Sequence, residues 1–322
     1  MDETTPPPAA SAEHTGEAAF PVTWAEYRAT GALMLIFVAN ILLAIIFASP
    51  FRAAGLQAFK DPENVGNVAW YIALILAFTF FILWLAKKRK WLIRVIILAA
   101  VGSTIAYVAY PVLYITLGWS FELSMGLSVA LAAGSVLALY KHPEWYVIDA
   151  VGLLVAAGSA SVFGISLGLV PVVVLLAALA VYDAIAVYRT KHMLSLADTV
   201  IELRLPVLLV IPKVAGYRFL KEEAKVKEAS SENKGEREAM FMGLGDLVMP
   251  TILVVSALQF AKPGWGIDPS LGAAIGTLVG FGVLMGYVLK GKPQAGLPLL
   301  NGGAIVGFLA GVYAATGSIK FW

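Results

Sequence analysis

The sequence predicts an all-α, polytopic membrane protein with nine transmembrane helices. The first observation is composition: 60% of the 322 residues are hydrophobic, 14% are charged, and the mean hydropathy is +0.82. A soluble domain is about half apolar and about a quarter charged, so this composition excludes a soluble globular enzyme, a disordered chain and a nucleic-acid-binding protein. The second observation is a series of apolar stretches of about 20 residues, the length that crosses a hydrocarbon core. The nine stretches are residues 29–49, 67–86, 92–112, 119–140, 145–165, 168–188, 239–260, 270–290 and 295–317.

These stretches divide the chain into five parts. The first residues contain Pro6-Pro7-Pro8 and are expected to form a solvated cytoplasmic tail. They show no basic stretch followed by a short apolar core and a cleavage site, so we expect the first span itself to anchor the protein. The expected parts are the tail at 1–28, six helices at 29–188, a cytoplasmic loop at 189–238, three helices at 239–317 and an external tail at 318–322.

Basic residues determine the expected orientation, because short loops rich in Lys and Arg stay in the cytoplasm. With the N-terminus inside, the long inner loop carries ten basic residues and the short inner loops carry seven: Lys87, Lys88, Arg89, Lys90, Lys141, Lys290 and Lys292. The outer side carries Arg52, Lys60, Lys262 and Lys320. We therefore expect a cytoplasmic N-terminus and an external C-terminus in a multi-pass protein of the cell membrane.

The loop at 189–238 has two halves of different character. Its second half, KEEAKVKEASSENKGERE, is highly charged and typical of a mobile, solvated segment. Its first half contains LRLPVLLVIPKVAGY, an apolar run that is too short to span a bilayer and holds Pro206 and Pro212. We expect an amphipathic or re-entrant piece there. It is either a hydrophobic linker on the bilayer surface or a gate or substrate-docking segment beside an active site.

Two aspartates are the strongest candidates for function, because ionisable side chains inside a membrane are costly. Asp183 lies five residues before the cytoplasmic end of the sixth stretch, and Asp246 lies seven residues after the start of the seventh. At about 1.5 Å of rise per residue, these positions are about 7 Å and about 10 Å from the same side of the membrane. Neither aspartate has a Lys, Arg or His in its own stretch.

Other polar or small residues in the stretches have simpler expected roles. Arg94 can extend to the aqueous surface, and Glu122 and Asp149 lie near span ends, where solvation or packing would satisfy them. Asn40 is expected to pack between helices. Glycines four residues apart in the last two stretches are expected to bring helices close together: Gly272, Gly276, Gly280, Gly303, Gly307 and Gly311.

Two carboxyl groups at one depth can supply an acid and a base together. Close carboxylates cannot both ionise cheaply, so one keeps its proton while the other stays charged. Activation of water against a peptide carbonyl has this requirement. Gly243 and Gly245 beside Asp246 remove side chains that would otherwise hinder a water molecule or a peptide.

Tyr182-Asp183 and Gly243-Leu244-Gly245-Asp246 resemble the YD and GxGD motifs of the presenilin and signal peptide peptidase family of nine-span intramembrane aspartyl proteases. A third family motif, Pro-Ala-Leu-Pro at the start of the last span, corresponds to Ala295-Gly296-Leu297-Pro298, in which the first two residues differ. The resemblance covers roughly residues 30–317 and includes the span count and the long loop after the sixth span. The short chain is most similar to archaeal presenilin homologues.

The resemblance implies a role for each residue of these motifs. Asp183 and Asp246 would be catalytic, and Tyr182 would either pack against the pair or contact substrate. Gly243, Leu244 and Gly245 would support the active site, and the segment Ala295, Gly296, Leu297 and Pro298 would hold the substrate backbone. Presenilins have a cytoplasmic N-terminus, so the expected partners are transmembrane-helix substrates of type I orientation, besides membrane lipid. The need for partner subunits stays open.

The residue inventory excludes other protease chemistries. The chain has no cysteine, and its three histidines, His14, His142 and His192, all lie outside the apolar stretches. A rhomboid-type serine protease and an HExxH metalloprotease are therefore excluded, and we expect no metal and no cofactor. Two alternatives remain: a prepilin peptidase-like aspartyl protease, and a proton- or cation-coupled transporter or channel that uses the paired aspartates.

Overall fold

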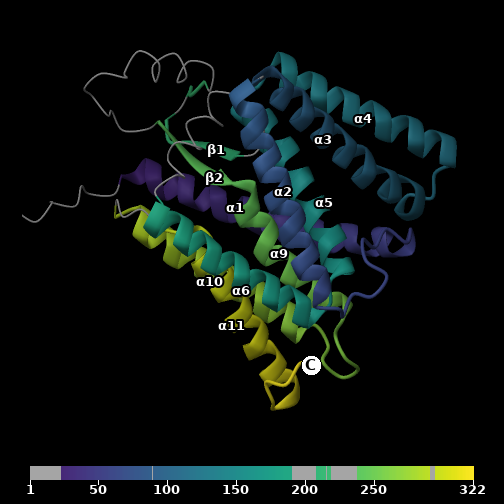
Figure 1. Cartoon of the computed structure of the whole chain (residues 1–322), viewed down its shortest axis with the longest axis vertical. Helices are drawn as coiled ribbons and strands as arrows, with labels where there is room; N and C mark the ends of the chain where they lie inside the picture. The colour runs from purple at the N-terminus through teal and green to yellow at the C-terminus, as the bar shows by residue number, and fades with distance from the viewer. Residues whose placement is uncertain (1–22, 89, 191–207, 215, 219–237, 291–293) are drawn as a thin grey trace, which may run out of the picture.

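A computed structural model describes residues 23–88, 90–190, 208–214, 216–218, 238–290 and 294–322. Over these residues the chain is mostly helical, with one short antiparallel ribbon (Figure 1). The helices and π-helical turns are α1 (Trp24–Ala53), α2 (Gly66–Lys88), α3 (Lys90–Pro111), η1 (Val112–Thr116), α4 (Phe121–Lys141), α5 (Trp145–Ser166), α6 (Leu169–Ile185), η2 (Ala186–Thr190), α9 (Leu244–Gln259), α10 (Asp268–Val288) and α11 (Gly296–Thr316). The strands are β1 (Leu208–Pro212) and β2 (Ala239–Gly243).

Seven of the described helices are long and apolar enough to cross a membrane. They comprise α1, α3 with η1, α4, α5, α6 with η2, α10 and α11. Two shorter apolar helical segments are Gly66–Ile82, which is the first part of α2, and Leu244–Gln259, which is α9. Each predicted apolar stretch therefore contains a helix. Most of the expected tail at 1–28 and of the loop at 189–238, including its charged half, lies outside the described residues.

The seventh predicted span needs correction, because the helix does not begin at residue 239. Residues Ala239–Gly243 form β2, which pairs antiparallel with β1, and α9 begins only at Leu244. The fold is therefore not purely α-helical. Gly243 is the N-cap of α9 in an extended conformation, with φ −67° and ψ 138°, so the change from strand to helix occurs at the first glycine of the GxGD motif.

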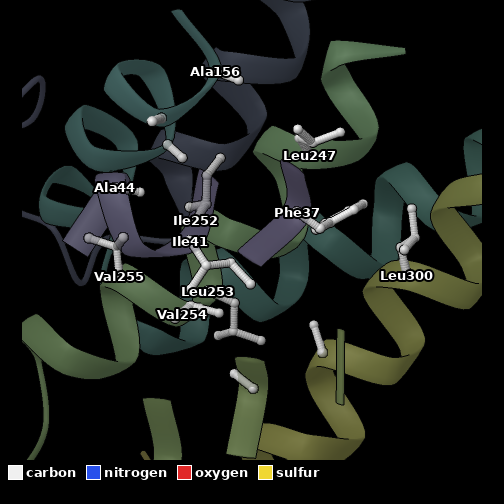
Figure 2. Close-up of a cluster of buried hydrophobic side chains, with 14 of the residues drawn as sticks. Phe37, Ile41, Ala44, Ala156, Leu247, Ile252, Leu253, Val254, Val255 and Leu300 are labelled. Atoms are coloured by element: carbon white, nitrogen blue, oxygen red, sulfur yellow. The ribbon is translucent and has the colours of Figure 1, made fainter. Parts of the chain in front are cut away.

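The short helix α9 forms the centre of the molecule. Every residue from Pro250 to Ala257 is buried, as expected for a helix that is apolar all round and enclosed by other helices. Figure 2 shows this core, in which Leu247, Ile252 and Leu253 of α9 lie among Phe37 of α1 and Leu300 of α11. Protein rather than lipid therefore surrounds most of the surface of α9.

Glycines allow the backbones of α10 and α11 to pack directly against each other, as predicted. A Cβ atom on Gly272 would overlap the carbonyl oxygen of Gly307, and one on Gly276 would overlap that of Gly303. Gly280 lies equally close to the carbonyl of Leu299, one residue after the Ala295–Pro298 motif. Close backbone approach of this kind maximises van der Waals contact where lipid provides no hydrophobic driving force. It also fixes the start of α11 against α10.

Buried polar side chains link the helices that surround the core. Asn40 of α1 is fully buried, and its Nδ2 donates to Thr251 Oγ1 of α9 at 3.0 Å, which confirms its expected packing role. Asn301 Nδ2 of α11 donates to the Leu176 carbonyl of α6 at 3.0 Å. Ser256 Oγ of α9 donates to the Leu167 carbonyl at 2.8 Å. Such bonds are worth about 1 kcal/mol each inside a membrane. They hold α1 against α9, α11 against α6, and α9 against the end of α5.

Candidate active site

Asp183 lies near the end of α6 and faces the start of α11. Its side chain is buried, with 6% exposed. The backbone N–H of Leu297 donates to Asp183 Oδ2 at 3.1 Å, and the N–H of Gly296 also donates to this carboxylate. These N–H groups belong to the first turn of α11, where backbone donors lack partners within the helix. They favour a negative charge on Asp183.

A second contact joins the same two regions. Tyr188, in the π-helical turn η2 that continues α6, donates from its hydroxyl to Gln294 Oε1 at 2.6 Å. Gln294 directly precedes the Ala295–Pro298 segment. The C-terminal end of α6 is therefore attached to the entry of α11 at two points, Gln294 just before the motif and Leu297 within it.

Asp246 occupies the third position of α9 and is half-buried. Its carboxylate accepts a hydrogen bond from the backbone N–H of Gly243, the N-cap residue of the same helix. This is the backward half of a capping box, in which an acidic residue at the third helical position satisfies the N-cap amide. The change from β2 to α9 therefore fixes the direction in which this carboxylate points.

The two aspartates are neighbours that interact electrostatically. Gly296 is close to both of them: its N–H donates to Asp183, and a Cβ atom on it would lie 3.3 Å from Asp246 Oδ1. The start of α11 is thus in contact with both carboxyl groups. The sequence predicted that these residues share one depth, and the structure brings them to one place.

The remaining motif residues differ in how close they come to the pair. Ala295 is buried, with 2% exposed, and is the extended N-cap of α11, while Pro298 occupies the third helical position, where its missing N–H costs nothing. Leu244 points toward α5, since its methyl groups lie against Gly152. Gly245 is open to its surroundings. Tyr182 is 57% exposed, so the structure places it on the outer surface of α6 and not packed around the carboxyl groups.

Sequence reasoning did not assign a specific role to Asp149 of α5. Asp149 is buried, with 8% exposed, and its Oδ1 accepts the backbone N–H of Val210 in β1 at 2.8 Å. β1 pairs with β2, and β2 leads into Gly243 and Asp246, so the contact of Asp149 with β1 helps to fix the position of Asp246. The one available signal was an ionisable residue in an apolar stretch; its strand partner, 61 residues away, could not be read from the sequence.

The chemistry available at this site is that of carboxyl groups. Within the described ranges of the chain, no group of three or more His, Cys, Asp or Glu side chains is arranged to hold a metal ion. Two carboxyl groups, backbone N–H donors and a glycine with no side chain are the groups that this candidate site offers. This is the arrangement that acid–base activation of a water molecule needs.

A family model described as signal-peptide peptidase, presenilin aspartyl protease matches residues 34–317. The chain belongs to this family. Two solved structures, each described as a presenilin family intramembrane aspartate protease, are similar to it. One, in a P2 space group, has 40% sequence identity and a TM-score of 0.65, with 88% of this chain and 97% of that chain covered. The other, in a C222 space group, has 38% identity and a TM-score of 0.67, with 89% and 99% covered.

A comparison with curated proteins returned no match. The family model and the solved structures together establish the class of this presenilin-family protein: it is an intramembrane aspartyl protease and an integral multi-pass membrane protein. Neither the prepilin peptidase-like alternative nor the transporter or channel alternative is favoured.

Proposed function

We propose that Asp183 and Asp246 are the catalytic pair of this protease and that they share one proton. The observation that carries the proposal is the contact of Gly296 with both carboxyl groups at the start of α11. In the described spans that carry them, α6 and α9, there is no Lys, Arg or His to neutralise two charges. A singly protonated pair is then the form that burial tolerates best.

Catalysis follows from that form of the pair. The ionised carboxylate takes a proton from a water molecule as the water oxygen bonds to the carbonyl carbon of the peptide, and the protonated carboxyl gives its proton to the carbonyl oxygen. In the second step one hydroxyl of the resulting diol returns a proton to the pair while the other carboxyl protonates the amide nitrogen. The C–N bond breaks, and the pair is again singly protonated.

A substrate helix must unwind before this reaction, because its amides are bonded internally. We propose that the unwound segment pairs with the outer edge of β2. Lys213 N–H donates to the Glu238 carbonyl at 2.8 Å, so these two residues form a hydrogen-bonded pair of the ribbon. In an antiparallel ribbon hydrogen-bonded and non-hydrogen-bonded pairs alternate. Phe241, three residues after Glu238, therefore belongs to a pair that is not hydrogen-bonded. The N–H and C=O groups of Phe241 therefore point away from β1. On the opposite edge, Asp149 already occupies the Val210 N–H, so the β2 edge suits a third strand better.

The finer topology is also part of the proposal. The seven long apolar helices together with the two shorter ones, at Gly66–Ile82 and α9, suit nine membrane passages. The distribution of Lys and Arg supports a cytoplasmic N-terminus, an external C-terminus and residence in the cell membrane. Substrates would then be transmembrane proteins of type I orientation. Tyr182 and Gly245 would border the entering substrate, Gly243 and Leu244 would support the start of α9, and Ala295 to Pro298 would hold the substrate backbone.

A single assay separates this function from its alternatives. The purified chain is incubated with a transmembrane peptide in detergent or liposomes, and proton or cation flux is followed in a parallel liposome sample. Peptide cleavage that depends on Asp183 and Asp246, without flux, is the expected result. Flux that depends on these residues without any cleavage would replace the protease by a transporter or channel.

A further inference from the structure

Asn40 of α1 contacts the part of α9 that directly follows Asp246. Its Nδ2 donates to Thr251 Oγ1 at 3.0 Å and to the Leu247 carbonyl at 3.4 Å. Asn40 and Thr251 are both fully buried, with 0% exposed. Leu247 is the next residue after Asp246. The contact therefore acts on the backbone that carries one of the two carboxyl groups of the candidate pair.

The same part of α9 lacks one of its helical hydrogen bonds. Pro250 lies inside the helix, four residues after Asp246. Proline has no N–H, so the Asp246 carbonyl cannot accept the bond that an α-helix normally provides there, and the proline ring also crowds this carbonyl. The helix itself therefore holds the backbone at Asp246 less firmly than usual, and a hydrogen bond from a neighbouring helix has more effect.

Helix packing alone does not require an asparagine at position 40. The neighbouring side chains on this buried face of α1, among them Phe37, Ile41 and Ala44, are apolar (Figure 2). Asn40 Oδ1 is buried and has no hydrogen-bond partner among the described residues. A buried polar atom without a partner costs free energy, which offsets part of what the Nδ2 bonds contribute. An apolar residue would pack against α9 without that cost, which points to a role of Asn40 other than stability.

We propose that Asn40 is a positioning residue for Asp246. It does not touch the reacting groups, but it fixes the first turns of α9 so that the Asp246 carboxyl stays beside Asp183. The Gly243 N–H holds the carboxylate itself from the other side. This inference rests on the proposed function, in which Asp246 is one of the catalytic pair. Loss of the Asn40 contact should lower the rate of the chemical step, which depends steeply on the position of the reacting groups, and leave substrate binding nearly unchanged.

The first test compares Asn40→Leu with Ser256→Ala in the cleavage of a transmembrane peptide by the full purified chain. Leucine keeps the branched shape of asparagine, and Thr251 Oγ1 can then donate to the Leu247 carbonyl of its own helix. Asn40→Leu should lower kcat by about tenfold, with KM and the unfolding temperature close to those of wild type. Ser256→Ala removes another buried hydrogen bond of α9, near its far end, and should lower the unfolding temperature while keeping kcat.

Pro250→Ala provides a second test that does not depend on the leucine variant. Alanine supplies the N–H that the Asp246 carbonyl lacks, so α9 then holds this turn by itself. Asn40→Ala, which removes the amide without adding bulk, should lower kcat by about tenfold in the wild-type chain and by less than about threefold in the Pro250→Ala chain. An equal loss in both chains would overturn the proposal.

Wild-type kcat in Asn40→Leu, or a loss no larger than that in Ser256→Ala, would also overturn the positioning role. Asp246→Asn, measured beside these variants, separates this failure from a failure of the proposed function. If Asp246→Asn is inactive while both Asn40 variants cleave normally, only the positioning role fails. If a folded Asp246→Asn protein cleaves substantially, the catalytic role of Asp246 fails, and the positioning role with it.

Discussion

The backbone N–H of Leu297 donates to Asp183 Oδ2 at 3.1 Å, so the first turn of α11 binds the carboxylate near the end of α6. Asn301, one turn further along α11, bonds the Leu176 carbonyl of α6. The glycine contacts with α10 fix the same part of α11 from its other side. The Ala295–Pro298 motif therefore acts as a rigid support for the candidate catalytic pair.

Substitutions at Gly296 should reduce activity according to side-chain size. A Cβ atom there would lie 3.3 Å from Asp246 Oδ1, so Gly296→Ala requires a shift of a few tenths of an ångström and should keep most activity. Gly296→Val adds two methyl groups beside the carboxylate and should lower kcat by roughly a hundredfold. The measurement is peptide cleavage by each purified variant.

Gly302 provides the matched control, because it lies on the same helix with open space around its Cα. Gly302→Ala and Gly302→Val should both cleave at close to the wild-type rate. If Gly296→Val were as active as Gly302→Val, the start of α11 would not contact the catalytic pair in the working enzyme.

Asp149 should act as a positioning residue for Asp246, through the β-ribbon. Asp149→Leu leaves the Val210 N–H without an acceptor and should lower kcat by roughly ten- to a hundredfold with little change in KM. Asp149→Asn retains an oxygen acceptor and should restore kcat to within a few-fold of wild type. Steady-state kinetics on both variants checks this, and an Asn variant as impaired as the Leu variant would refute the positioning role.

The rate of cleavage should pass through a maximum as pH is varied. At low pH both carboxyl groups are protonated and no base remains; at high pH both are ionised and no acid remains. A pair that shares one proton thus gives a bell-shaped profile. Initial rates at each pH, with folding checked by circular dichroism, provide the measurement. A rate that rises to a plateau through alkaline pH would mean that one carboxylate acts alone as a base.

The N-terminus and the loop at 189–238 should be cytoplasmic. Because the chain has no cysteine, single introduced cysteines report their side of the membrane cleanly. Lys60→Cys should react with a membrane-impermeant reagent outside intact cells, and Ser231→Cys should react only after permeabilisation. External labelling of Ser231→Cys would reverse the orientation and with it the expected orientation of substrates.

The helices could be predicted from the sequence because hydropathy and length determine a membrane span. The error at 239–260 has a physical cause. Ala239, Met240, Phe241 and Met242 are apolar, and a short apolar run does not distinguish a strand from a helix. The strand forms because β1 lies beside it, and β1 begins 31 positions earlier in the chain, a pairing that local pattern does not reveal.

The residues of the candidate site could be identified from the sequence, but the contacts between them could not. Asp183 and Asp246 stand out because charges are rare in apolar stretches, and the glycines of α10 and α11 follow a readable spacing. The hydrogen bonds of Asp183 with the start of α11, and of Asp149 with β1, could not be predicted, since each joins residues more than 60 positions apart. The exposed position of Tyr182 depends in the same way on how α6 is rotated against its neighbours.

The most direct test of the catalytic pair is cleavage of a transmembrane peptide by four purified proteins: wild type, Asp183→Asn, Asp246→Asn and Glu122→Gln. Each Asn variant keeps the size of the side chain and removes the acid–base function, so each should lose activity by about a thousandfold or more while unfolding at a wild-type temperature. Glu122→Gln should cleave normally. Substantial cleavage by a folded Asp183→Asn or Asp246→Asn protein would contradict a mechanism in which these two aspartates activate water together.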